Sequence, residues 1–258
     1  MTTSTTDPTS GMTGRVAMVT GGSRGIGAAT ATKLAAHGAL VGVGGRDETA
    51  IDQIVTGIRS TGGQAIAVPA HATDADALTA AYTSLEQHFG PVELLAAFAG
   101  GNGRPRPSEQ VEPDEWRHVI DADLTTCFLT IRAALPTMID QGRGSIVTMA
   151  SAAGRQPSQA AAAYAAAKAG VIGLSKHLAA EMGPRGIRIN CLAPSAVLNE
   201  KMATTMTHQQ QEQLAATFPL GRLGQPDDVA NAAIFLLSDH ASWLTGVTLD
   251  VSGGHIIT

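Results

Sequence analysis

The chain has 258 residues, of which 44% are hydrophobic and 15% charged, so it is long enough to bury the core of one large α/β domain. A net charge of -5 with no basic block argues against nucleic acid or an anionic membrane surface as a partner. The sequence has no long apolar run, no CxxC pair at Cys127 or Cys191 and no HExxH motif. A membrane span and a metal site are therefore without support, and we expect a protein of the reducing cytoplasm.

The first residues contain no positive charge and no apolar centre, which predicts a flexible tail at 1–13 rather than a signal peptide. Short apolar runs then alternate with longer amphipathic segments such as 75–89 and 226–239. Because the runs are continuous, they predict strands buried on both faces; they are residues 15–20, 39–43, 64–69, 93–99, 144–151, 187–194 and 246–254. The alternation predicts one α/β domain over 14–258, with a parallel sheet of about seven strands and helices on both faces.

The stretch "TGGSRGIG" at 20–27 leaves the first predicted strand and opens a helix. Glycines permit a tight turn, and the N–H groups of a helix start attract phosphate, so this placement predicts a dinucleotide site. The same residues also match the G-x-S-x-G elbow of an α/β-hydrolase around Ser23, with Asp250 and His255 following in the order of a triad. A hydrolase is therefore the remote alternative.

The stretch "AAAAYAAAKAG" at 160–170 places Tyr164 and Lys168 four residues apart, about one helical turn. The two side chains lie on one face of a helix whose alanines let a large group approach. The plainer interpretation is a surface pair in which the lysine stem covers the ring. Further along, the Gln-, Thr- and Met-rich stretch at 195–220 interrupts the strand–helix alternation. In such sheets ligands bind at the carboxyl ends of the strands, so we expect a substrate lid at 195–220.

These motifs together resemble the short-chain dehydrogenase/reductase family, from about Gly14 to Gly254. "TGGSRGIG" is similar to the family's TGxxxGxG turn, and Tyr164 with Lys168 to its YxxxK pair. Ser151 stands thirteen residues before the tyrosine, where the family keeps a serine. "LAPSAV" resembles its nicotinamide loop, and "GRLGQPDDVANAAIFLLSD" with "TGVTLDVSGG" its C-terminal passage. The nearest resemblance is to 3-oxoacyl-thioester (acyl-carrier-protein) reductases.

The resemblance implies a Rossmann-type doubly wound fold and a carbonyl reductase or alcohol dehydrogenase. Its catalytic residues would be Ser151, Tyr164, Lys168 and Asp123. Tyr164 would act as acid and base, since Lys168 and the oxidised nicotinamide both stabilise the ionised phenol. Ser151 would polarise the carbonyl. Three residues between Tyr164 and Lys168 speak against an enoyl reductase, whose pattern has six.

The resemblance also implies a nicotinamide cofactor site. Its residues would be Gly21, Ser23, Arg24, Gly25, Ile26, Gly27, Arg46, His71, Ala72, Ala99, Gly100, Tyr164, Lys168, Pro194 and Val197. An NAD enzyme places an acid where Gly45 stands, whereas here Arg46 follows and Arg24 is near. Two guanidinium groups match a 2′-phosphate, so we expect NADP(H) to be preferred over NAD(H); two solvated arginines are the alternative.

Four departures from the family pattern favour a rival function, a dinucleotide-binding sensor or scaffold with weakened catalysis. They are "AFAG" at 97–100, His71 in place of an acid, Ser195 in the nicotinamide loop, and Asp123 in place of an asparagine. An ionised Asp123 near Lys168 would offset the pull of the lysine and hold the Tyr164 proton more firmly, which favours reduction over alcohol oxidation.

The partners expected are a small carbonyl or alcohol substrate and further copies of the chain. The substrate walls would come from 101–107, 152–159 and the lid. Arg104, Arg106 and Arg155 would either meet an anionic substrate or be solvated. By resemblance alone we expect a homo-oligomer, a tetramer or dimer, formed through the helices around Asp123 and Tyr164.

Overall fold

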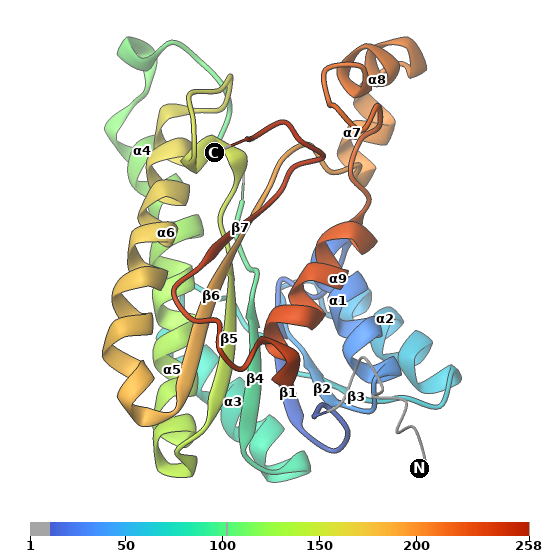
Figure 1. The fold of residues 1–258 in the computed structure, drawn as a ribbon, viewed down its shortest axis with the longest axis vertical. Coiled ribbons are helices and arrows are strands. Elements are labelled where there is room, and N and C mark those ends of the chain that lie inside the picture. The colour runs from blue at the N-terminus through green and yellow to red at the C-terminus, as the bar shows by residue number, and fades with distance from the viewer. Residues whose placement is uncertain (1–10, 102, 258) are drawn as a thin grey trace, which may run out of the picture.

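A parallel sheet forms the centre of the computed structural model, which describes residues 11–101 and 103–257 (Figure 1). Its strand order is β3-β2-β1-β4-β5-β6-β7, and every pairing is parallel. The strands are β1 Val16–Thr20, β2 Leu40–Val43, β3 Gln64–Ala67, β4 Val92–Ala97, β5 Gly144–Met149, β6 Ile187–Pro194 and β7 Thr248–Val251. The order reverses between β1 and β4, so the predicted doubly wound sheet of seven strands is confirmed.

Helices cover both faces of this sheet (Figure 1). They are α1 Gly25–Ala36, α2 Glu48–Ser60, α3 Ala75–Phe89, α4 Pro113–Ile120, α5 Thr126–Gln141, α6 Ala162–Met182, α7 Glu200–Thr205, α8 His208–Ala215 and α9 Pro226–Leu237. One core cluster joins α3, α5 and α6 to the sheet, and the other joins α1, α2 and α9. The continuous apolar strands are therefore buried from both sides, as expected of a parallel sheet.

Local signals set several helix bounds. The side chain of Asp74 accepts hydrogen bonds from the N–H groups of Asp76 and Ala77 at 3.0 Å, and α3 begins directly after it. Gly90, with a φ of 98°, ends that helix. The observed bounds of α3 are those predicted from periodicity, 75–89. The last strand is shorter than predicted, since β7 covers only the middle of 246–254.

The predicted N-terminal tail at 1–13 is mostly outside the described residues, which begin at 11. Met12 is fully buried in the core beneath α1, α2 and α9, and the Gly14 N–H donates to the Gly38 carbonyl at 2.8 Å. Met12 lies within the predicted tail and is nevertheless buried, because an apolar side chain just before β1 is drawn into the core.

The predicted lid segment, 195–220, contains α7 and α8. Both helices stand beyond the carboxyl ends of the strands, on the opposite side of that edge from α4 (Figure 1). The thiols of Cys127 and Cys191 are free and buried in the core shared with α5 and α6. Burial raises the pKa of Cys127 to about 12, so this thiol stays protonated at neutral pH.

Candidate active site

Four segments far apart in the sequence meet at the carboxyl ends of the central strands. They are the loop after β4, the turn between α4 and α5, the loop after β5, and α6. Gly100 shows how closely they pack, because a Cβ built there would lie 2.8 Å from Asp123 Oδ1 and 3.3 Å from Lys168 Nζ. A larger residue at 100 would separate the loop from these side chains.

Asp123 lies in a π-helical turn, Asp121–Thr125, that joins α4 to α5. This turn places the carboxylate inside the protein, where its side chain is 0% exposed. Oδ1 accepts a hydrogen bond from the Gly101 N–H at 3.2 Å. Oδ2 is buried and has no hydrogen-bond partner among the described residues. A buried, half-satisfied carboxylate is costly unless a cation stands beside it.

Lys168 is that cation. Its Nζ lies 2.9 Å from Asp123 Oδ1 and donates to the Met149 carbonyl at 3.0 Å. Burial by itself would lower the pKa of Lys168, but the facing Tyr164 and Asp123 more than offset it, so the pKa is raised. The ammonium therefore stays charged at neutral pH. Two of its three donors are engaged, which leaves one for another ligand.

Tyr164 lies one turn before this lysine on α6, with Nζ 5.5 Å from the centre of its ring. The predicted surface pair is wrong, because Lys168 is buried and Tyr164 half-buried. Ser151 follows β5 and accepts from the Ala153 N–H at 3.2 Å. Gly154 lets this loop reach α6, since a Cβ at 154 would lie 2.6 Å from the Ala169 nitrogen. The serine loop thus packs against the backbone beside Lys168.

The phosphate turn after β1 fits a dinucleotide. At Gly27 a Cβ would lie 2.1 Å from the Gly21 carbonyl oxygen, so only glycine allows α1 to begin so close to the turn. Gly21 itself has a φ of 67°. No side chain caps the start of α1, and its first turn contains no acid. Its N–H groups are therefore available to an anion, together with the turn residues Ser23, Gly25 and Ile26.

The "AFAG" segment keeps its place without the amides that the family pattern has there. The hydroxyl oxygen of Thr20, at the end of β1, accepts from the N–H groups of Phe98 at 3.2 Å and Ala99 at 3.3 Å. Phe98 packs against the core on the α9 side. This role of Thr20 cannot be inferred from a local sequence pattern, because it depends on the adjacency of β1 and β4.

The far end of the predicted cofactor site carries the two arginines. Arg46 is exposed after β2, and Arg24 Nη2 lies 3.5 Å from Asp47 Oδ2, with both of these side chains largely exposed. A Cβ at Gly45 would meet only Ser23 and Ile51, at 3.5–3.6 Å. His71, after β3, is exposed and shares a hydrogen bond of 2.6 Å with Thr73; Ala72 follows it.

The predicted nicotinamide loop leaves β6 at the buried Pro194. Val197 pairs with Gly224 in an isolated parallel bridge. Between them, the Ser195 hydroxyl lies 2.7 Å from His255 Nδ1, and the ring of His255 packs on Phe218 at 5.0 Å. A cavity of about 450 Å³ lies beneath this loop, bounded by residues from the end of the lid segment and from the chain after β7.

Two expectations for charged residues need correction. Arg155 makes a bidentate ion pair with Asp250, both bonds 2.9 Å long, so it joins the serine loop to β7 instead of being solvated. Asp250 and His255 therefore have other partners than Ser23, and the hydrolase triad is wrong. In the predicted wall 101–107, Asn102 lies outside the described residues. Arg106 pairs with Glu115 at 3.3 Å, and Arg104 is exposed.

No helix within 11–101 and 103–257 is long and apolar enough to cross a membrane. In the same residues, no group of three or more His, Cys, Asp and Glu side chains is arranged to hold a metal ion.

Comparison with known proteins places this geometry among dehydrogenases and reductases. Residues 20–255 match the family model described as Enoyl-(Acyl carrier protein) reductase. A 2,5-dichloro-2,5-cyclohexadiene-1,4-diol dehydrogenase of Sphingobium indicum is 35% identical, over 94% of this chain and 96% of its own. The 3-oxoacyl-[acyl-carrier-protein] reductase of Escherichia coli is 36% identical, over 93% and 97%. The crystal structure of levodione reductase superposes with a TM-score of 0.90 at 31% identity, over 94% and 97%.

Proposed function

Because the chain belongs to the short-chain dehydrogenase/reductase family of oxidoreductases, we propose that it transfers hydride between NADP(H) and a ketone or secondary alcohol, with Tyr164 as acid and base. One observation supports this most. The charged Lys168 is buried at the carboxyl ends of the strands, and its Nζ lies 5.5 Å from the centre of the Tyr164 ring. Its backbone packs against Gly154 of the serine loop. A buried ammonium beside a phenol stabilises the ionised phenol more strongly than an ammonium in a solvated surface pair does.

Each of these side chains has a defined role. The phosphate turn and the α1 N-terminus would hold the cofactor, which would supply the hydride when bound. Ser151 donates a hydrogen bond to the carbonyl oxygen of the substrate and polarises it. The Tyr164 hydroxyl gives its proton to the oxygen as negative charge develops there. Lys168 stabilises the phenolate left behind, and its remaining donor is free for a ribose hydroxyl.

We propose carbonyl chemistry rather than enoyl reduction, although the family model carries an enoyl reductase description. Three residues separate Tyr164 from Lys168, whereas the enoyl reductase pattern has six. The proposed substrate class is a 3-oxoacyl thioester or a related small ketone, in keeping with the name of the Escherichia coli relative. A diol dehydrogenase among the relatives supports a secondary alcohol as the reverse substrate.

The proposal is tested by a panel of ketones, 3-oxoacyl thioesters and secondary alcohols, followed at the nicotinamide absorbance. We expect turnover on at least one class. In Tyr164→Phe turnover should fall by about two to four orders of magnitude, while cofactor affinity measured by titration stays nearly unchanged, because the variant removes only the proton-donating hydroxyl group. Undiminished turnover in the variant would refute the role of Tyr164.

The same panel tests the rival function, a dinucleotide-binding sensor or scaffold. The observation that favours the rival is the direct Asp123–Lys168 ion pair, which weakens the positive field at the phenol. Tight cofactor binding with no turnover on any substrate would support it. We also propose that the chain forms a homo-oligomer, a tetramer or dimer, whose mass light scattering can measure.

A further inference from the structure

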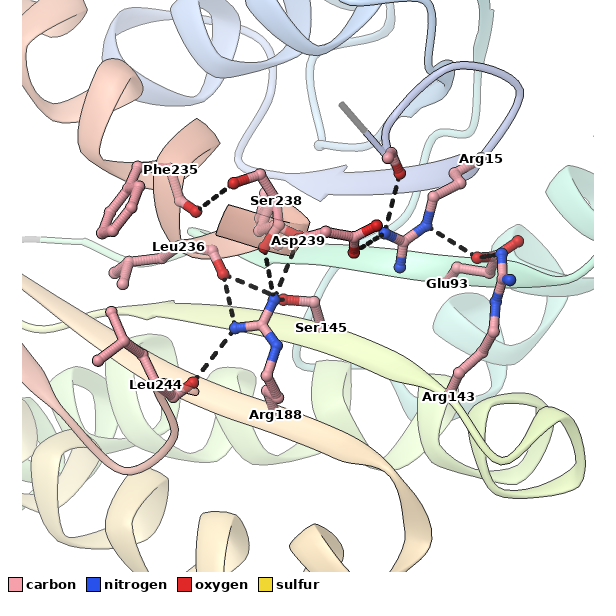
Figure 2. A network of polar contacts seen from close by, with 12 residues as sticks. Arg15, Glu93, Arg143, Ser145, Arg188, Phe235, Leu236, Ser238, Asp239 and Leu244 are labelled. Carbon is pink, nitrogen blue, oxygen red and sulfur yellow. Dashed lines mark hydrogen bonds and ion pairs between the residues drawn. The ribbon is translucent and has the colours of Figure 1, made fainter. Parts of the chain in front are cut away.

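A second cluster of charged residues lies at the amino-terminal end of the sheet, opposite the candidate active site (Figure 2). Its arginines come from the starts of three strands: Arg15 precedes β1, Arg143 precedes β5, and Arg188 is the second residue of β6. Glu93, in β4, and Asp239, in the turn after α9, are its carboxylates. Neither the catalytic chemistry nor the cofactor explains this cluster.

Two of the three guanidinium groups, those of Arg15 and Arg143, form ion pairs with these two carboxylates. Arg15 Nε lies 2.9 Å from Glu93 Oε2, and its Nη1 lies 3.1 Å from Asp239 Oδ1. Arg143 forms an ion pair with the same Glu93 oxygen. The cluster therefore carries a net positive charge. Within the described residues, Arg15 Nη2 and both Nε and Nη1 of Arg143 make no hydrogen bond.

Arg188 has only neutral partners. It donates to the carbonyl oxygens of Leu236 at 3.0 Å, Ser238 at 3.0 Å and Leu244 at 3.2 Å, and to the Ser145 hydroxyl at 2.9 Å (Figure 2). These contacts satisfy the carboxyl end of α9. Burial lowers the pKa of Arg188, and the positive charge of Arg15 lowers it further. The two guanidinium groups therefore repel one another, and the nearby carboxylates offset this only in part.

The three arginines line one cavity of about 860 Å³. This is within the usual size range of small-molecule sites. Glycines and Ser145 also line the cavity, as does Trp243, which is 97% exposed. Asp239 is the one acidic side chain on the wall among the described residues. The cavity thus offers unused guanidinium donors, excess positive charge and an aromatic surface in one place.

We propose that this cavity is a binding site for a small metabolite that carries a phosphate group, separate from the nucleotide site. The unused donors of Arg15 and Arg143 bind the phosphate oxygens, and Arg188 adds charge without a direct contact. The phosphate relieves the repulsion between the guanidinium groups. The ring of Trp243 covers whatever apolar or planar part the metabolite carries.

The test is calorimetric titration of pyrophosphate into enzyme already saturated with NADPH, with a parallel series in NADH, so that the phosphate turn is occupied. We expect one pyrophosphate per chain. Arg143→Gln should weaken binding by about tenfold or more, because it removes a charged, bidentate donor. Arg143 is half exposed, so this variant should fold. The pyrophosphate affinity of Arg143→Lys should lie between those of the wild type and Arg143→Gln, since lysine keeps the charge but cannot make a bidentate contact.

Arg117→Gln is the matched control. Arg117 is also exposed and paired with a carboxylate, Asp114, but it lies on α4, outside the cavity. Its affinity for pyrophosphate should equal that of the wild type. Two results would each overturn the proposal: no pyrophosphate binding to the cofactor-loaded enzyme, or equal affinities in wild type and Arg143→Gln. The test holds whichever substrate the enzyme reduces.

Discussion

At the scale of single residues, the carboxylate of Asp123 is the departure with the clearest chemical consequence. An asparagine would offer the Lys168 ammonium a neutral oxygen, whereas Asp123 offers a charged one at 2.9 Å in a buried place. Low-dielectric surroundings strengthen that attraction. The negative charge of Asp123 therefore compensates part of the positive charge of Lys168, which stabilises the ionised phenol of Tyr164 less as a result.

The prediction concerns the pH profile of alcohol oxidation, which requires the ionised phenol. Removing the carboxylate in Asp123→Asn restores the full pull of Lys168, so ionisation becomes easier and the oxidation profile should move to lower pH. The measurement compares initial rates of alcohol oxidation across pH in the wild type and the variant. A profile that is unmoved or shifted to higher pH contradicts the proposed role.

Arg46 gives a second prediction at this scale. It is exposed beside the neutral Gly45 and, unlike Arg24, has no ion pair among the described residues. If Arg46 binds the 2′-phosphate, Arg46→Ala should weaken the binding of NADPH by about tenfold or more, or ~1.4 kcal/mol. The affinity for NADH should stay nearly unchanged. Fluorescence titration with both cofactors measures this. Equal losses for the two would show that Arg46 does not distinguish them.

At the scale of elements, the chain after β7 ties both ends of the lid segment together. His255 bonds to Ser195 at the start of the lid and packs on Phe218 near its end. The backbone adds a third contact, from the Leu220 N–H to the Gly253 carbonyl at 3.1 Å. Ser195 thus has a side-chain hydrogen-bond partner that a glycine would lack. Through this bond the chain after β7 holds the predicted nicotinamide loop in place.

We therefore predict that His255→Ala loosens this loop and raises the KM for the cofactor several-fold, with a smaller effect on thermal stability because His255 is exposed. Ser195→Gly should have the same effect, and the double variant should add little, since both remove one contact. His88→Ala, an exposed histidine packed on Phe89 in α3, is the control. Additive losses in the double variant would show that the two residues act separately.

At the scale of the whole molecule, exposed apolar side chains on the outer helices support the proposed homo-oligomer. Phe128 on α5 is 44% exposed, in the layer that contains Asp123 and α6. A charge introduced at Phe128 therefore tests whether this layer forms the interface.

The prediction is that light scattering gives two or four times the chain mass of 26.3 kDa. Phe128→Glu should lower that mass by placing a charge in the interface. Leu220→Glu, at a more exposed apolar position in the lid segment, should leave it unchanged. A monomeric wild type would contradict the oligomer, and an unchanged Phe128→Glu assembly would place the interface elsewhere.

The fold class, the strand positions, the bounds of α3, the phosphate turn and the Tyr164–Lys168 spacing could all be predicted from the sequence. These are local signals: periodicity, capping residues and glycines act within a few residues of the chain, so they can be read along it. Asp123 was identified as a departure by its position in the same way, but its effect depended on where its charge would lie.

How the charges meet is visible only in the folded chain. The family resemblance places Asp123 near Lys168, and the fold sets their separation at 2.9 Å inside the protein. The fold also joins Lys168 to the Met149 carbonyl and Arg155 to Asp250, and it buries Met12, which the sequence assigns to a loose tail. Such contacts join residues on different strands and helices, and they depend on strand order and on the direction of each side chain. Burial then sets their strength, because a charge is worth far more inside the protein than in water. Neither quantity is encoded in a local pattern.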